Sequence, residues 1–225
     1  MKSMLSFSGG KNSTAMLLRL KELGQMPDKI IFCDTLMEYP EVYEFIDKVE
    51  KHIGQKIIRL KPNNSFLKWF FKEYQKGCRF EGRIHGFPYI RTPCWYQREA
   101  KVTPLKKYND EADVVYIGYA KGEENRKLKD PKFKYPLIEW GWDEQKSEEY
   151  CKEKGFLNPL YQKFRRTGCW CCPLQGKKDL KILYKDYPAL WRILVQLEEL
   201  SPHGFQTKYT LGDIEKEVEV ENGTI

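Results

Sequence analysis

Long hydrophobic runs are absent from this 225-residue sequence, and no apolar stretch approaches the roughly 18 residues that span a bilayer. Internal repeats and low-complexity segments are missing as well. The first residues lead into an apolar strand pattern rather than a secretory leader, so we expect a cytoplasmic protein with no membrane partner. With 41% hydrophobic residues, the chain can bury a core as one domain, or as one domain with a small appendage.

Histidine is scarce, and the three histidines show no mutual ligand spacing, which removes them from the candidate metal ligands. Cysteine is more plentiful, with seven in the chain. In a reducing compartment, cysteines are better explained as metal ligands or reactive thiols than as a disulfide framework. The formal net charge of +7 is compatible with a polyanionic partner, although a nucleotide substrate alone accounts for part of it.

Two common nucleotide-binding patterns, GxxxxGK[ST] and GxGxxG, do not describe the glycine-rich segment near the start of the chain. There an apolar run at residues 4–7 is followed by SGGKNST at 8–14 and then by an amphipathic run. This order predicts a strand, an anion-binding loop and the start of a helix. Adjacent glycines let the backbone approach an oxyanion, and first-turn N–H groups, hydroxyls and a lysine supply donors. An ordinary strand-to-helix turn with capping residues is the alternative.

Strands and helices alternate through the first half of the chain. Apolar runs at residues 29–34, 56–60 and 113–118 predict strands, and helical patterns occur at 41–53, from 65 to about 75, and up to about 107. Such alternation predicts a doubly wound parallel α/β sheet that is covered on both faces. The site then belongs where the strand order reverses, at the carboxyl ends of the strands. The loop at 8–14, Asp34 and Gly118 all fall on that edge.

The loop resembles the SGGxxS PP-loop of the ATP pyrophosphatase and adenine nucleotide α-hydrolase-like superfamily. Further segments resemble, in the same order, those of phosphoadenosine phosphosulfate (PAPS) and adenosine phosphosulfate (APS) reductases. They are DTLMEYPE at 34–41, KVTPL at 101–105, residues 118–126, PLIEW at 136–140, NPLY at 158–161 and GCWCC at 168–172. Asn12, Leu36 and Ala120 depart from the aspartate, glycine and arginine that these patterns have. The chain is therefore identified as PAPS reductase-like over residues 4–173.

This resemblance implies a Rossmann-like nucleotide-binding domain at residues 1–140 and a cysteine-containing helical extension at 141–225. It also implies that the loop binds the terminal phosphates of ATP, with Asp34 near the ribose or a Mg²⁺ ion. Cleavage between the α- and β-phosphates demands charge neutralisation and alignment more than a covalent nucleophile. The expected catalytic residues are Lys11, Lys101, Glu123 and Arg126. The expected nucleotide-binding residues are Ser8, Gly9, Gly10, Asn12, Ser13, Thr14, Asp34 and Gly118. Capping or a solvated surface position is the alternative for each charged residue.

The cysteines suggest a metal centre. Cys169 and Cys172 form a C-x-x-C pair, whose spacing lets two thiolates meet one metal. In APS reductases a similar pair joins upstream cysteines around a [4Fe–4S] cluster, and Zn²⁺ or no metal are the alternatives here. The expected ligands are Cys94, Cys169, Cys172 and one of Cys78 or Cys171. Cys33 and Cys151 are expected to be small buried hydrophobes.

Beyond residue 173 the patterns predict helices at 177–184 and 188–200, followed by a polar, acidic tail from residue 206. No cysteine follows Cys172, whereas sulfonucleotide reductases use a C-terminal thiol as nucleophile, and this favours chemistry other than reduction. The basic and aromatic stretch from Lys72 to Arg98 suits phosphate contacts and base stacking. A loop that folds over the nucleotide and the metal explains the same composition.

Three functional hypotheses follow. The first is an ATP-dependent PP-loop enzyme that forms AMP and pyrophosphate while activating an acceptor for sulfur transfer, with a nucleic acid or a sulfur carrier as a further partner. The second is a PAPS or APS reductase. The third is a catalytically silent module that senses a nucleotide and binds nucleic acid or a protein partner.

Overall fold

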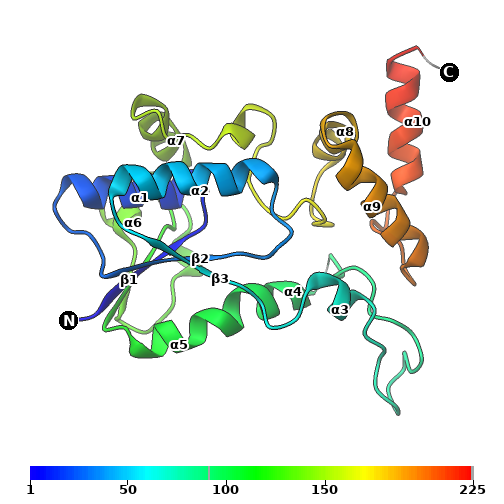
Figure 1. The fold of residues 1–225 in the computed structure, drawn as a ribbon, viewed down its shortest axis with the longest axis horizontal. Helices are drawn as coiled ribbons and strands as arrows, with labels where there is room; N and C mark the ends of the chain where they lie inside the picture. Colours follow the sequence, from blue (N-terminus) through cyan, green and yellow to red (C-terminus); the bar gives the residue numbers. More distant parts are fainter. Residues whose placement is uncertain (91, 224–225) are drawn as a thin grey trace. The chain divides into compact units, whose positions relative to one another are not determined.

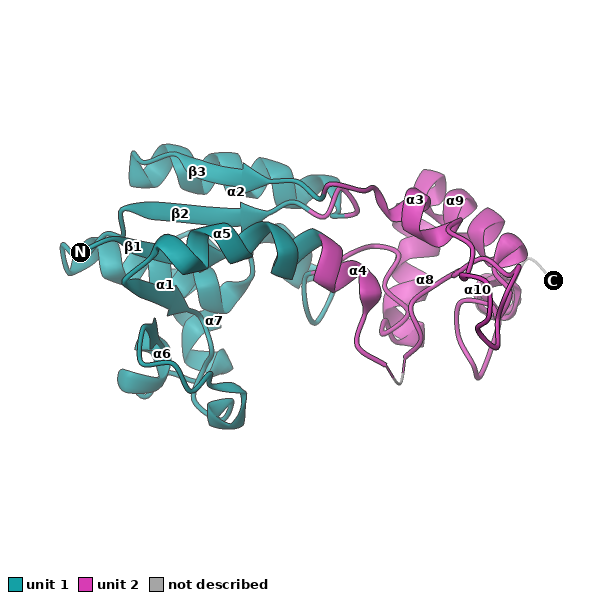
Figure 2. Ribbon diagram, turned by 90° about the horizontal axis from the view of Figure 1, so that it is seen from below, with its two compact units in different colours: residues 1–34, 38–62, 100–167 teal, residues 35–37, 63–99, 168–225 magenta. Residues whose placement is uncertain are grey.

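The computed structural model of the chain describes residues 1–90 and 92–223. The chain folds into two compact units, which Figure 2 colours separately. The sheet unit comprises residues 1–34, 38–62 and 100–167, and the cysteine unit comprises residues 35–37, 63–99 and 168–225. This division places residues 141–167 with the sheet and 63–99 with the C-terminal helices, whereas the sequence led us to expect a boundary at residue 140.

The sheet unit is built on a five-stranded, all-parallel sheet in the order β3-β2-β1-β4-β5. The chain runs outward from β1 to β3 and then adds β4 and β5 on the other side of β1, so the strand order reverses between β1 and β4. The predicted doubly wound parallel sheet is thus confirmed. The strands are β1 (Ser3–Phe7), β2 (Lys29–Cys33), β3 (Ile57–Leu60), β4 (Val114–Ile117) and β5 (Phe133–Lys134). The sequence did not predict β5, because two residues give no apolar run.

Helices cover both faces of this sheet (Figure 1): α1 (Lys11–Glu22) and α2 (Pro40–Ile53) lie on one face, and α5 (Thr103–Glu111) lies on the other. Met4, Ile31 and Val115 form a buried cluster against which Leu105 of α5 packs. Because successive strand side chains point to opposite faces, the fully buried Leu5 points toward the α1–α2 layer.

Shorter elements complete the sheet unit. Helix α7 packs against α1, and the 3₁₀ turn η3 packs against α2. None of the described helices combines the length and apolar composition that crossing a bilayer requires. The remaining elements are the π-helical turn η1 (Arg98–Val102), the 3₁₀ turn η2 (Glu124–Arg126), α6 (Pro136–Glu139), α7 (Glu144–Glu153) and η3 (Pro159–Gln162).

The cysteine unit contains α3 (Phe66–Phe70), α4 (Trp95–Gln97), α8 (Lys177–Asp186), α9 (Pro188–Leu200) and α10 (Leu211–Glu221). Helices α8, α9 and α10 pack against one another. The Trp191 indole of α9 donates a hydrogen bond to Glu215 of α10, with 2.6 Å between nitrogen and oxygen. This buried tryptophan ties two of the helices together.

Two expectations for this unit were wrong. The helix expected from residue 65 to about 75 ends at Phe70, because the next backbone groups pair across a hairpin: Tyr74 N–H donates to Arg83, and His85 N–H donates to Lys72. The tail beyond residue 206 is not merely polar, since Thr210 and Asp213 form a capping box that starts α10. Charged and apolar residues alternate at 217–221, a pattern that does not indicate the helix. The buried stripe of α10 consists of Leu211, Ile214 and Val218.

Candidate functional site

The loop after β1 leaves backbone donors open at the start of α1. Gly9 has φ +71°, a left-handed conformation that glycine adopts without strain, and Gly10 caps the helix without a side-chain hydrogen bond. Lys11 N–H donates to the Tyr161 hydroxyl at 3.0 Å. The N–H groups of Asn12 and Ser13 have no hydrogen-bond partner among the described residues. The positive end of the α1 dipole thus carries two amides for an anion.

Hydroxyl groups hold this loop in shape. The Ser13 hydroxyl donates to the Gly10 carbonyl at 3.0 Å and accepts from Ser8 N–H at 3.2 Å. The Ser8 hydroxyl lies 3.0 Å from that of Ser13 and accepts from Gly10 N–H at 3.3 Å. Thr14 is fully buried, and its Oγ1, like Oδ1 of Asn12, is a buried polar atom without a partner among the described residues. Unpaired buried oxygens at this position fit a site whose ligand completes the hydrogen bonding.

Gly118 brings the end of β4 against the same loop. A Cβ atom on Gly118 would lie 3.1 Å from both Cα and N of Ser13 and 3.3 Å from the carbonyl carbon of Asn12. These contacts are to backbone, which cannot rotate away. The predicted convergence of the residue 8–14 loop and Gly118 at the reversal of strand order is confirmed by this close approach.

Two residues behind the loop fix its position, and the sequence did not assign them a role. The side-chain amide of Asn158 donates to the Gly9 carbonyl at 2.9 Å, while its oxygen accepts from Leu160 N–H at 3.0 Å. Tyr161 accepts from Lys11 N–H, and burial raises the pKa of its phenol. Both belong to the NPLY segment, which is the sequence signal that pointed to them.

Lys11 lies on α1, but its ammonium group points to α7. Its Nζ is 3.1 Å from Glu148 and 3.4 Å from Glu144. Burial disfavours its charge, yet the hydrogen bonds and charges of the two carboxylates outweigh burial and raise its pKa. These contacts give Lys11 a structural role that joins α1 to α7, and its expected catalytic role stays a prediction.

Asp34 and Lys101 lie at the carboxyl end of β2. Asp34 is almost fully buried and accepts a hydrogen bond from the Tyr43 hydroxyl at 2.8 Å. The Lys101 carbonyl accepts from the Cys33 thiol at 3.7 Å, which places that backbone beside the same strand end. Burial raises the pKa of Cys33 to about 11, so this thiol stays protonated at neutral pH. Asp34 thus lies at the edge where the sequence placed it, and the Lys101 backbone lies beside the same strand end.

Glu123 and Arg126 follow β4 and pair with each other. The Glu123 carboxylate accepts from the Arg126 guanidinium and from Ala120 N–H, the latter at 3.0 Å. The guanidinium also lies over the Tyr119 ring, 4.4 Å from its centroid. The Arg126 side chain is 56% exposed, which leaves it able to bind a phosphate.

Most of the cysteines expected to bind metal lie in the cysteine unit at partly buried positions. Cys94 caps α4 by accepting from Gln97 N–H at 3.4 Å, and Cys169 donates to the Thr35 hydroxyl at 3.5 Å. Cys78 is exposed in the hairpin. Cys171 is buried, and burial first, then Cys169, Cys172 and Cys94, raises the pKa of its thiol. These three neighbours influence it electrostatically, so they lie in one region of the unit.

Within residues 1–90 and 92–223, no three His, Cys, Asp or Glu side chains gather closely enough to hold a metal ion. The cysteines in this arrangement therefore do not fit a cluster or a zinc ion, and the metal site stays a prediction from which we derive no step. The expectation that Cys33 and Cys151 are buried is confirmed. Burial raises the pKa of Cys151 to about 12.

An all-parallel sheet whose reversal point holds an amide-lined loop is the arrangement typical of α/β proteins with a PP-loop. Residues 2–175 match the phosphoadenosine phosphosulfate reductase domain family, and the chain belongs to that family. The matched region covers both the loop and the C-x-x-C pair.

Two curated relatives come from the archaeon Methanocaldococcus jannaschii. Protein MJ0066 is 34% identical over 209 residues, which cover 84% of this chain and 39% of the relative. Protein MJ0973 is 26% identical over 201 residues, which cover 83% of this chain and 45% of the relative. The chain thus spans less than half the length of either relative.

Among solved structures, the chain is similar to a PAPS reductase from Candida auris in complex with phosphate. The TM-score is 0.55 at 20% identity, covering 76% of this chain and 82% of that one, which shows a shared fold. The U34-tRNA thiolase NcsA from Methanococcus maripaludis, with its [4Fe-4S] cluster, aligns with a TM-score of 0.43 at 15% identity, covering 97% of this chain and 81% of that one. A score of that size does not establish a common fold.

Proposed function

We propose that the chain binds ATP at residues 8–14 and cleaves it to AMP and pyrophosphate while activating an acceptor, with sulfur transfer as the purpose of that activation. One observation carries the proposal. At the start of α1, the amides of Asn12 and Ser13 and the buried Thr14 hydroxyl have no partner among the described residues. Together these donors match a polyphosphate, because they are fixed, neutral and aligned with the helix dipole.

The proposed reaction is a nucleophilic substitution at phosphorus. A nucleophilic oxygen of the acceptor attacks the α-phosphorus, the bond to the α–β bridging oxygen breaks, and pyrophosphate leaves with that electron pair. The adenylylated acceptor then loses AMP when a sulfur nucleophile, supplied by a donor, displaces it. Each step places negative charge on phosphate oxygens, so the protein must supply fixed donors and cations.

In our proposal, different residues bind the phosphates, neutralise their charge and hold the metal ion. The first-turn amides and the Thr14 hydroxyl hold the β- and γ-phosphates, the Ser8 and Ser13 hydroxyls keep the loop in shape, and Gly118 lets the end of β4 pack against the loop. Lys101 and Arg126 neutralise charge at the α-phosphate. Asp34 would hold a Mg²⁺ ion, whose chemistry is to neutralise the polyphosphate. Glu123 orients Arg126 through their ion pair.

The test is pyrophosphate release from ATP by the purified chain, together with calorimetric titration of ATP. We expect ATP to bind and pyrophosphate to form when an acceptor fraction is supplied. Gly118→Ala should abolish both. Gly212→Ala is the matched control, because its added Cβ meets only Thr210 Oγ1, at 3.7 Å. Failure of the native chain to bind ATP would refute the proposal, and binding without turnover would indicate a nucleotide sensor instead.

Sulfonucleotide reduction is the second candidate, and the family match favours it. That chemistry needs a thiolate nucleophile, and burial disfavours Cys33, Cys151 and Cys171 for this task because it raises the pKa of each. Sulfite formation from PAPS or APS with thioredoxin would establish this candidate over the first. An absorbance spectrum of anaerobically purified protein, together with iron and zinc analysis, tests the expected metal, because thiolate-bound iron–sulfur clusters absorb at about 400 nm.

A further inference from the structure

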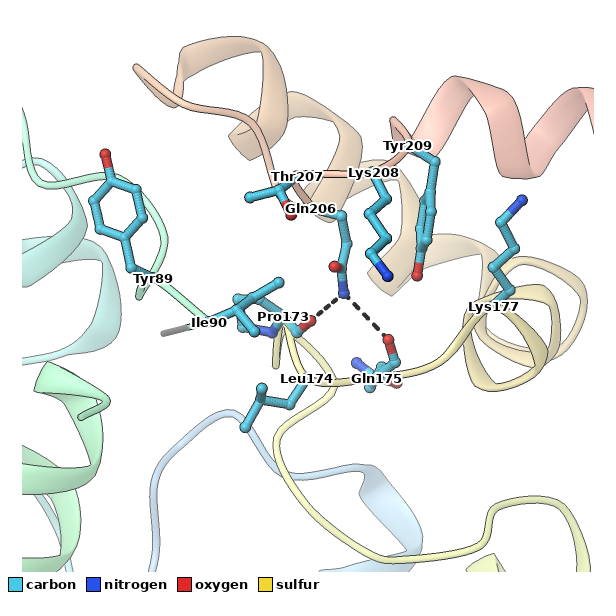
Figure 3. A pocket seen from close by; sticks show the side chains of 10 residues that line it. All are labelled: Tyr89, Ile90, Pro173, Leu174, Gln175, Lys177, Gln206, Thr207, Lys208 and Tyr209. Atoms are coloured by element: carbon cyan, nitrogen blue, oxygen red, sulfur yellow. Dashed lines mark hydrogen bonds between the residues drawn. The ribbon is translucent and has the colours of Figure 1, made fainter. Parts of the chain in front are cut away.

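The cysteine unit contains a cavity of about 910 Å³ that the proposed ATP chemistry does not use. Figure 3 shows that one part of it is apolar, lined by Ile90, Pro173 and Leu174, while Lys208 and Tyr209 lie side by side in another part. The Gln206 amide donates to the Pro173 and Gln175 carbonyls and thereby ties two segments of the lining together. A second, smaller cavity in the same unit shares Tyr89 with the first. We call the two cavities together the Tyr89 surface.

The charged side chains that line the Tyr89 surface are Lys and Arg. Neither cavity is lined by Asp or Glu, although the chain contains 32 of them. Lys177 is neutralised by Glu217. By contrast, Arg83 in the small cavity and Lys208 in the large one have no ion-pair partner among the described residues. Residues 63–99, which supply seven of the 17 residues that line this surface, contain seven Lys and Arg against three Asp and Glu, a net charge of +4. The surface therefore suits an anionic ligand.

An exposed aromatic ring is shared by the two cavities that contain these cations. Tyr89 is 43% exposed and lines both cavities. It stacks on the His203 ring at a centroid distance of 4.1 Å and an interplanar angle of 13°. His203 is itself held by a 2.8 Å hydrogen bond between Nε2 and the Phe87 carbonyl. The His203 ring packs against one face of Tyr89, and the exposed part of the Tyr89 ring can serve as a flat platform.

Close packing joins the two segments that carry Tyr89 and His203. Gly86 has φ +66°, and a Cβ atom there would lie 2.6 Å from the Ser201 hydroxyl and 2.7 Å from Cδ of Pro202. Only glycine lets the hairpin and the segment after α9 come this close. Phe205 also packs edge-on against Phe87 at 4.9 Å. The hairpin and the segment after α9, which carry Tyr89 and His203, are therefore packed against each other.

We propose that the Tyr89 surface binds single-stranded nucleic acid: an unpaired base stacks on Tyr89, and Arg83 and Lys208 contact the phosphates on either side of it. Base stacking on an aromatic ring combined with a cationic groove is how proteins bind unpaired strands without strong sequence preference. A duplex offers no free base face to Tyr89. An acidic peptide would use the cations but would leave the platform without a planar partner.

This proposal does not depend on ATP cleavage, because all of its residues belong to the cysteine unit. The two ideas can therefore fail separately. Gly118→Ala, which should abolish ATP binding, should leave the affinity for nucleic acid unchanged.

Fluorescence anisotropy of the full chain with a labelled single-stranded RNA of about 12 nucleotides tests the proposal. Arg83→Gln/Lys208→Gln should weaken binding about tenfold and reduce the slope of log affinity against log salt by about 1.4, since single strands give about 0.7 per neutralised phosphate. Lys185→Gln is the matched control. Lys185 is exposed on α8, lines neither cavity and has no ion-pair partner among the described residues. It should change the affinity less than about twofold.

The platform is tested by two substitutions at one position. Tyr89→Leu keeps apolar bulk but removes the ring, and it should weaken binding about 5- to 100-fold. Tyr89→Phe keeps the ring and should bind like the native chain. Any of four results would overturn the proposal: no binding tighter than about 100 µM at low salt, equal affinity for duplex RNA, equal competition by polyglutamate, or equal losses for Lys185→Gln and the double variant.

Discussion

The loop at residues 8–14 and the Tyr89 surface both suit phosphate, but they offer it different donors. The loop presents backbone amides and hydroxyls, while its own lysine is occupied by Glu144 and Glu148. The Tyr89 surface presents side-chain cations and a ring. Fixed amides demand one geometry and so suit a single small ligand. Flexible cations accept many geometries, and their contribution falls as salt rises.

The largest expected effect is at Gly118. Gly118→Ala places Cβ 3.1 Å from the Ser13 backbone, so β4 or the start of α1 must shift. Because the amide donors of the loop are fixed rather than flexible, we expect ATP binding to be lost, with a fall in affinity of at least about 30-fold, and the free energy of unfolding to fall by about 1–3 kcal/mol. Calorimetric titration and chemical denaturation measure the two quantities.

The control for Gly118→Ala is Gly212→Ala, which should retain ATP affinity and stability. Native ATP affinity in Gly118→Ala would show that the loop tolerates displacement. The loop would then accept phosphate in more than one geometry, as the flexible cations of the Tyr89 surface do, and the contrast between the two regions would be lost.

A smaller effect is expected at Asn158. Asn158→Ala removes the donor to the Gly9 carbonyl and the acceptor for Leu160 N–H, so two buried backbone groups lose their partners. We expect a loss of about 2 kcal/mol in the free energy of unfolding, measured by urea denaturation, and weaker ATP binding. Asn158→Asp keeps the acceptor and should recover part of the stability. Full native stability in Asn158→Asp would show that the contact with Gly9 does not matter.

Lys11 offers a double-mutant cycle that sharpens the comparison. Lys11→Gln removes the cation that Glu144 and Glu148 share and leaves Glu148 only its pair with Lys152, so we expect about 1 kcal/mol of destabilisation. Adding Glu148→Gln should restore stability and, if Lys11 only positions the loop, ATP affinity as well. If ATP binding stays weak in the stable double variant, Lys11 contacts the nucleotide, and the loop uses a cation just as the Tyr89 surface does.

The smallest effect is at the other end of α1. Hydrogen bonds from Lys154, then from Arg19 and Tyr150, lower the pKa of Glu22 to about 2. This contribution to stability is complete above the unfolded pKa of 4.5 and is lost as the pH falls toward 2. Because the Glu22 side chain is 34% exposed, solvent screens the interaction, and Glu22→Gln should cost less than about 1 kcal/mol at pH 7. Acid titrations of both proteins should converge near pH 2; a constant difference would contradict the assignment.

The sequence predicted the sheet because its signals are local. Apolar runs predict β1, β2, β3 and β4, and the parallel order with one reversal follows from the helices between them. The glycine pair and Gly118 could be placed at one edge for the same reason. Placing these residues at one edge requires only the direction of each strand, and strands that alternate with helices along the chain run parallel.

The remaining features depend on contacts that are distant along the chain. The Lys11 pairs with Glu144 and Glu148 and the support of the loop by Asn158 and Tyr161 join residues more than a hundred positions apart. The spacing of apolar residues along the sequence does not indicate such contacts. The early end of α3 depends on nearer contacts that periodicity does not indicate either, since cross-hairpin bonds replace helical ones there.

The most direct test of the central claim is an NMR titration of the ¹⁵N-labelled chain with a non-hydrolysable ATP analogue. The account predicts that the amide resonances of Asn12 and Ser13 shift strongly, because phosphate oxygens become their hydrogen-bond acceptors, while that of Lys11, already bonded to Tyr161, shifts little. Binding of the analogue with unchanged Asn12 and Ser13 resonances would contradict it.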